Sequence, residues 1–68
     1  MSKKRAGGFI FITYKGDHRP FHVHIEREGR EIGRWDIENQ RPLDRFDLTR
    51  KLREALTRLG YLRETPNR

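Results

Sequence analysis

Cysteine is absent from the 68-residue chain, which excludes a disulfide framework, a thiolate nucleophile and a cysteine-ligated zinc site. Long apolar runs are also absent. The longest, at residues 9–12, is far short of the ~20 residues that a membrane-spanning helix needs and of the apolar core of a secretory signal. We therefore expect a cytoplasmic protein that neither enters a membrane nor is exported by that route.

Apolar residues are scarce: 32% of the chain is hydrophobic and 38% is charged. The four Phe, two Tyr and one Trp nevertheless gather in the apolar segments, which argues for a folded chain. A chain this short buries only ~60% of its unfolded surface, so it has room for one thin core. We therefore expect a homodimer or a cognate small protein partner to complete the buried surface.

Acidic residues are outnumbered by basic ones, since ten Asp plus Glu face sixteen Lys plus Arg and give a net charge of +6. Such an excess favours polyanionic partners, nucleic acid first among them. The alternative is that these cations only keep a small protein soluble.

Three strands are predicted from the local patterns. Residues 1–7 are basic and glycine-rich and are expected to be a flexible arm, whereas 8–62 form one domain and 63–68 a loose tail. Apolar segments at 9–14, 21–26 and 31–37 predict strands, with a turn at 15–20. A three-residue loop at 27–29 is predicted to place Phe21 opposite Trp35, and His22 opposite Arg34.

A helix follows, because leucine and alanine recur at helical spacing between Leu48 and Leu59. Asp44 or Asp47 is expected to cap its start, and Gly60 to end it in a left-handed conformation. Its apolar stripe is expected to cover Phe21 and the other apolar residues of its face of the sheet. The predicted fold class is therefore α+β: a three-stranded antiparallel sheet with one C-terminal helix packed on one face.

The segment with the most chemical content is the histidine box, residues 17–24 (Asp-His-Arg-Pro-Phe-His-Val-His). It contains all three histidines of the chain, His18, His22 and His24. The period-two alternation of the strand predicts that His22 and His24 point the same way, opposite to the apolar face. Two imidazoles about 7 Å apart along a strand can exchange protons with one phosphodiester.

This arrangement is suited to RNA cleavage, in which the attacking group is the RNA's own 2′-hydroxyl. The candidate catalytic residues are His18, His22 and His24. Arg19 or Arg34 could stabilise the extra charge of the pentacoordinate phosphate, and Lys15 could bind a neighbouring phosphate.

Two alternatives use the same residues. The three histidines could instead ligate a metal ion, with His18 completing a His22-x-His24 pair. In a noncatalytic protein-binding module they would only stabilise the turn, while the open sheet face docks a partner. No cofactor is implied by the sequence.

The histidine box and the strand at 34–37 resemble the small bacterial family called domain of unknown function 4160. The resemblance covers about residues 8–62 and rests on an Asp-His-x-Pro-x-His-Val-His motif, matched here at Asp17, His18, Pro20, His22, Val23 and His24. Members of that family are often encoded beside another small protein and are suspected of forming toxin–antitoxin pairs. The resemblance therefore implies a protein partner.

A weaker resemblance is to the HicA messenger-RNA interferases, in which a strand leads to a Gly-Ser-His box and a leucine-rich helix ends in glycine. The corresponding box here is Gly16-Asp17-His18. This resemblance implies an activity on RNA and singles out His18. Together the patterns predict a small basic component of a bacterial toxin–antitoxin type module that engages nucleic acid, RNA rather than DNA.

Overall fold

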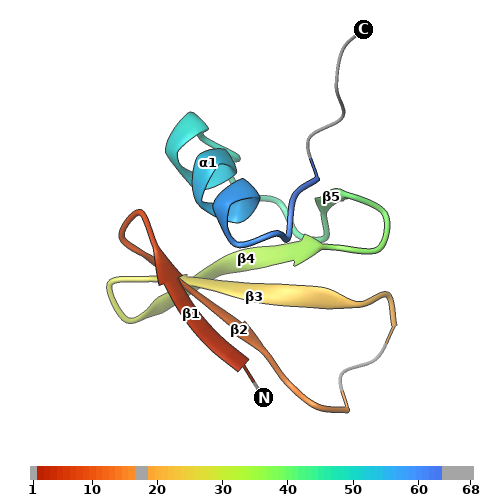
Figure 1. Ribbon diagram of the computed structural model, residues 1–68. Helices are drawn as coiled ribbons and strands as arrows, with labels where there is room; N and C mark the ends of the chain where they lie inside the picture. The colour runs from red at the N-terminus through yellow and green to blue at the C-terminus, as the bar shows by residue number, and fades with distance from the viewer. Residues whose placement is uncertain (1, 17–18, 64–68) are drawn as a thin grey trace, which may run out of the picture.

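The structure, a computed structural model, describes residues 2–16 and 19–63, which form one antiparallel sheet and one helix (Figure 1). The sheet has five strands, β1 to β5, paired in chain order. The elements are β1 (Ser2–Ala6), β2 (Phe9–Thr13), β3 (His22–Arg27), β4 (Arg30–Asp36), β5 (Arg41–Pro42) and α1 (Arg50–Arg58). The predicted α+β class is confirmed, but the predicted count of three strands is wrong.

The N-terminal segment is the first correction, because it forms edge strand β1 and not the expected flexible arm. Gly7 and Gly8 both have positive φ, 59° and 84°, and this tight turn reverses the chain so that β1 pairs along the whole of β2. Ala6 is buried in the core, and Lys4 Nζ lies 5.7 Å from the ring centroid of Tyr61. An edge strand tolerates charged residues well, so the basic composition did not reveal it.

The second additional strand, β5, lies at the opposite edge of the sheet, where only a connection was expected. Its two residues pair with the end of β4, Pro42 with Trp35 and Arg41 with Asp36. Gln40, at φ 58°, turns the chain into it. Proline is acceptable here because an edge strand does not need every backbone donor for its ladder.

The β3–β4 hairpin closes with two residues and not with the predicted three. Glu28 and Gly29 both have positive φ, and Arg27 pairs directly with Arg30. A register shift beside Ile25 then leaves one extra residue in β4. Beyond this bulge, core-facing residues of β3 again pair with core-facing residues of β4. In the resulting register Val23, not Phe21, lies opposite Trp35.

Helix α1 is capped by Thr49, whose hydroxyl accepts a hydrogen bond of 3.2 Å from the backbone of Leu52. The predicted caps Asp44 and Asp47 are therefore wrong: both precede the helix by several residues, and Asp44 instead binds Arg34.

The predicted helix end is confirmed. Gly60 has φ 87°, and the backbone N–H of Tyr61 donates to the carbonyl of Leu56 at 2.9 Å, as in a Schellman motif.

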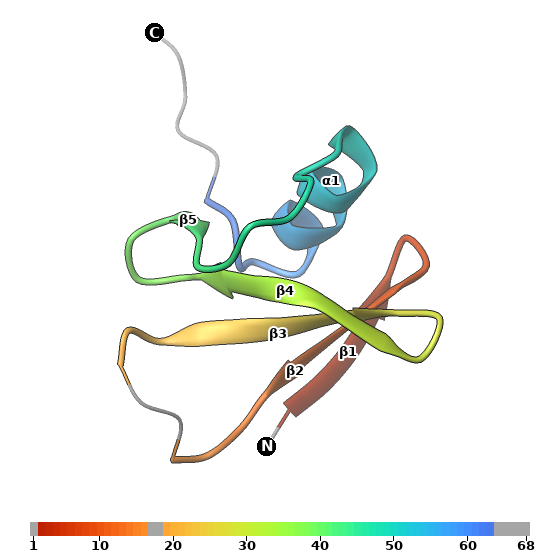
Figure 2. The same cartoon turned by 180° about the vertical axis from the view of Figure 1, so that it is seen from behind.

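The core lies between α1 and one face of the sheet, as the two opposite views show (Figures 1 and 2). From the sheet it takes Phe9, Phe11, Val23, Ile25 and Trp35, and from α1 it takes Leu52, Ala55 and Leu56. Phe21 was expected to join this core, but it precedes β3 and is 55% exposed. Among residues 2–16 and 19–63 no helix has the length and apolarity to cross a bilayer.

Candidate functional site

His22 and His24 lie on the sheet face opposite α1, because Val23 and Ile25 between and after them point into the core. Their ring centroids are 5.1 Å apart in an edge-to-face contact. We call this side of the sheet the histidine face; in the row through His24 it also carries Lys3, Ile12 and Arg34.

The imidazole of His22 is almost fully buried, at 5% exposure. Its Nδ1 lies 2.7 Å from the carbonyl oxygen of Pro20, at the end of the cis Arg19–Pro20 peptide. A carbonyl oxygen only accepts, so Nδ1 bears the hydrogen and donates it. In the neutral ring the basic lone pair is therefore on Nε2.

His24 is more accessible, with a side chain 16% exposed. Its Nδ1 lies 3.0 Å from Glu31 Oε1, and a carboxylate again fixes the hydrogen on Nδ1 and the lone pair of the neutral ring on Nε2. The ring of Tyr14 meets it edge to face, with the centroids 4.9 Å apart. A carboxylate behind an imidazole orients the ring and stabilises its protonated form.

Cations flank His24 on the histidine face. Pairing runs from Lys3 to Ile12, from Ile12 to His24 and from His24 to Arg34, so these four residues occupy neighbouring strands in one row. Adjacent strands are about 4.8 Å apart, which places a lysine two strands to one side of His24 and an arginine one strand to the other.

Arg34 is held in place by Asp44. Its Nε donates to Oδ2 at 2.9 Å and its Nη2 to Oδ1 at 2.7 Å, a two-bond fork. The hydrogen bonds from Arg34 and the charge of its guanidinium group lower the pKa of Asp44. A phosphate bound by Arg34 would therefore meet a guanidinium group that is already hydrogen-bonded to Asp44.

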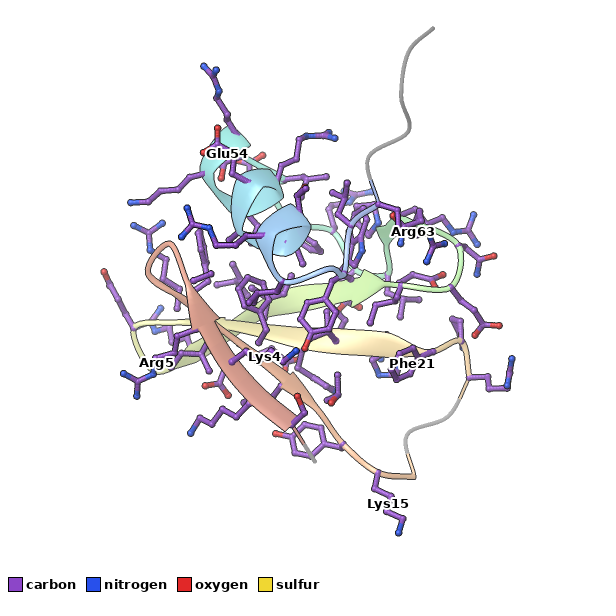
Figure 3. All side chains as sticks on the ribbon, viewed as in Figure 1. Lys4, Arg5, Lys15, Phe21, Glu54 and Arg63 are labelled. Carbon is purple, nitrogen blue, oxygen red and sulfur yellow. The ribbon has the colours of Figure 1, made fainter. Side chains whose placement is uncertain are left out.

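The other predicted phosphate contacts lie elsewhere. Lys15 is exposed in the turn after β2 and points outward from the sheet (Figure 3). Arg19 donates to Glu38 Oε2 at 2.9 Å. The structure therefore brings together His22, His24 and Arg34, whereas Lys15 and Arg19 are on the connection between β2 and β3.

The carboxylate of Glu38 fixes the backbone at the start of β3 through two hydrogen bonds. Its Oε1 accepts a 2.7 Å hydrogen bond from the backbone of Phe21, while its Oε2 accepts from Arg19. The bond from Phe21, followed by that from Arg19, lowers the pKa of Glu38. This carboxylate fixes the chain immediately before the two histidines.

Asp36 is the residue paired with His22, and it is completely buried. Burial alone would raise its pKa, but hydrogen bonds from the side chain and backbone of Asn39, helped by Arg41, bring the pKa below its ordinary value. The buried carboxylate is therefore ionised near neutral pH and fixes the turn that leads into β5.

Stability is expected to fall in acid because Asp36, Glu38 and Asp44 all have lowered pKa values in the folded state. Such groups stabilise the fold above their unfolded pKa values, near 4, and this contribution is lost as the pH falls through the folded values. Thermal melts from pH 7 to pH 2 should show a melting temperature that declines below about pH 4. Asp44→Asn should weaken this decline, whereas Asp47→Asn, at an exposed position, should not; equal effects would contradict the assignment.

His18 and Asp17 lie outside the described residues, so the predicted third histidine has no place in this geometry. Within residues 2–16 and 19–63, no group of three or more histidine and carboxylate side chains is arranged to hold a metal ion. The metal-binding alternative, which needs His18 as its third ligand, stays a prediction.

Two contributors to the site were not identified from the sequence, Tyr14 and Glu31, since the predicted hairpin register did not bring Glu31 to His24. Lys3 was expected in a flexible basic arm and not in a strand that places it in the row of His24. The one available signal was the run of aromatic and β-branched residues up to Tyr14, which places its ring at the end of β2.

Comparison of the chain with protein-family models, with curated proteins and with solved structures finds no match. The two resemblances seen in the histidine box therefore remain expectations.

Proposed function

We propose that this chain is a small basic protein directed at RNA, and that it cleaves RNA through the imidazoles of the histidine face. The observation that supports this most is the His22–His24 pair: the rings are 5.1 Å apart, and both bond through Nδ1 to oxygen acceptors. Each neutral ring then carries its lone pair on Nε2, the atom that would exchange protons with a substrate. One neutral and one protonated imidazole form the acid–base couple that phosphodiester transfer requires.

In the proposed reaction the more accessible His24 acts as the base. Its Nε2 removes the proton of an RNA 2′-hydroxyl, whose oxygen forms a bond to the adjacent phosphorus. The P–O5′ bond breaks, and the departing oxygen receives a proton from a second imidazole, for which we propose His22. The products are a 2′,3′-cyclic phosphate and a free 5′-hydroxyl, and Glu31 stabilises the imidazolium that forms on His24.

The positive charge of the protein favours RNA over an uncharged substrate. The chain has a net charge of +6, and Lys3 and Arg34 flank His24 in its row. Positive groups beside the reacting phosphate would stabilise the additional charge of the pentacoordinate state. The resemblances in the histidine box extend the proposal to a toxin–antitoxin type module with a cognate small protein partner.

The test uses the purified chain and one labelled oligonucleotide sequence made in three versions: RNA, 2′-deoxy and 2′-O-methyl. We expect cleavage of the RNA alone, with cyclic phosphate ends detected by mass spectrometry, because only RNA contains the attacking hydroxyl. Cleavage of the DNA version, or products with 5′-phosphate ends, would contradict a 2′-hydroxyl mechanism.

One observation favours a second candidate, a noncatalytic partner-binding module. His22 is only 5% exposed and its Nδ1 bond holds Pro20 in place, as expected for a residue that stabilises the turn. In that case RNA stays intact in every version of the assay, and the His22→Ala variant changes stability alone.

A further inference from the structure

A hollow of about 410 Å³ opens where β5, α1 and the segment after the helix meet. The segment after α1 passes beside β5 in both views (Figures 1 and 2), and Figure 3 labels Arg63 on it. Three arginines line the hollow, one from each element: Arg41, Arg53 and Arg63. We call it the arginine hollow. Among residues 2–16 and 19–63, its remaining lining includes Pro42, Leu48 and Leu62 but no carboxylate.

The arginines of the hollow are poorly neutralised by the protein. Within the described residues neither Arg53 nor Arg63 forms an ion pair, and Arg41 comes no closer than 3.9 Å to Asp36 Oδ2. The residues four before and four after Arg53 are the N-cap Thr49 and Thr57, neither of which carries a charge. Arginines that line one concave surface repel one another unless an anion lies between them, and Arg53 and Arg63 are the two that the described residues leave without an ion pair.

The wall of the hollow is fixed by Gln40, a non-glycine residue at φ 58°. Its Nε2 donates to the carbonyls of Ile37 and Tyr61, at 2.8 and 2.9 Å, and its Oε1 accepts from the backbone of Arg63 at 2.7 Å. Trp35 Nε1 donates to the same Tyr61 carbonyl at 3.0 Å. These bonds tie the segment after the helix to the β4–β5 turn, so the backbone that bears Arg41 and Arg63 is preorganised.

We infer that the arginine hollow is a binding site for a phosphate group. Guanidinium groups match the oxygens of phosphate with paired N–H donors, and a phosphate accepts from several of them at once. A single carboxylate offers two oxygens and one charge, which satisfies three arginines less completely. Most of the lining lies on the helix side of the sheet, and only Arg41, which pairs with Asp36, belongs to the row of His22. The inference therefore does not depend on the proposed cleavage.

The test is a ¹H–¹⁵N NMR titration of the full chain at constant ionic strength, with sodium chloride as the reference salt. The probes are inorganic phosphate and a 2′-O-methyl oligonucleotide, which has a phosphodiester backbone but cannot be cleaved through a 2′-hydroxyl. We expect saturable shifts at the Gln40 side-chain amide, the Trp35 indole and the Arg63 amide. Saturation by both probes identifies a backbone phosphate as the ligand, and saturation by inorganic phosphate alone identifies a small phosphate compound.

Matched variants locate the binding. Arg53→Gln and Arg63→Gln should each weaken phosphate binding at least about tenfold, since each removes charge-assisted hydrogen bonds. Arg58→Gln removes the same charge from an exposed position of α1 outside the hollow and should change the affinity little. Shifts spread evenly over the basic surface, equal losses in all three variants, or tighter saturation by a poly-glutamate peptide would overturn the inference.

Discussion

Replacing Phe11 with alanine is expected to lower the free energy of unfolding by about 3–5 kcal/mol, the usual cost of truncating a buried phenylalanine. The side chain of Phe11 is completely buried, and its ring lies 6.2 Å from that of Phe9 and 6.0 Å from that of Tyr61, measured between centroids. A chain of 68 residues has a total stability of roughly 3–10 kcal/mol. Urea titration followed by circular dichroism at 25 °C should therefore show a midpoint far below that of the wild type, or no folded baseline at all.

The matched control for this substitution is Phe21→Ala. Phe21 is 55% exposed and lies outside the core, so the same loss of a ring should change the free energy of unfolding by less than about 1 kcal/mol. If the two variants are equally stable, the core does not lie between α1 and the face of β2 that bears Phe11.

His24→Ala is expected to reduce RNA cleavage by about 10²- to 10⁴-fold, the usual contribution of a general base. The side chain is partly accessible and lies opposite the core, so the variant should melt within a few degrees of the wild type. Initial rates on the labelled RNA, measured beside melting curves, separate loss of chemistry from loss of fold. Lys51→Gln, on the exposed side of α1, removes a charge away from the histidine face and should retain the wild-type rate.

The Glu31→Gln variant tests whether the carboxylate of Glu31 orients the imidazole of His24. Loss of the carboxylate beside Nδ1 removes the group that fixes the hydrogen on Nδ1 and orients the ring of His24, so the cleavage rate should fall while the melting temperature stays within a few degrees of the wild type. A His24→Ala variant that keeps its cleavage rate, or a Glu31→Gln variant that cleaves RNA at the wild-type rate, would exclude the proposed roles.

The fold was predictable where one local pattern decides the structure. The alternation around Val23 placed His22 and His24 on one face, and the leucine spacing with Gly60 gave the helix and its ending. The edge strands were not predictable in this way. The charges of β1 suggested an unstructured arm, and β5 is held by only two paired residues.

The sequence predicted the histidines of the candidate site but not the side chains that contact them. Which side chain meets His24 depends on the β3–β4 register, and that register is set by the two-residue turn at Gly29 and the shift beside Ile25. The inserted residue changes the phase of the alternation in β4, since Ile32 and Trp35 both pack against the core, but the sequence does not say which turn length accompanies that change. For the same reason the pairing of Arg34 with Asp44 emerged only from the three-dimensional structure.

The two margins of the sheet differ in chemistry but share one effect on assembly. Along β1, Lys3, Lys4 and Arg5 are consecutive, so a second copy aligned antiparallel along this strand would set like charges against one another on both sheet faces. At the other margin, β5 offers only two residues, one of them a proline without a backbone donor. Continuous growth of the sheet from copy to copy, the route to fibrils, is therefore disfavoured at both ends.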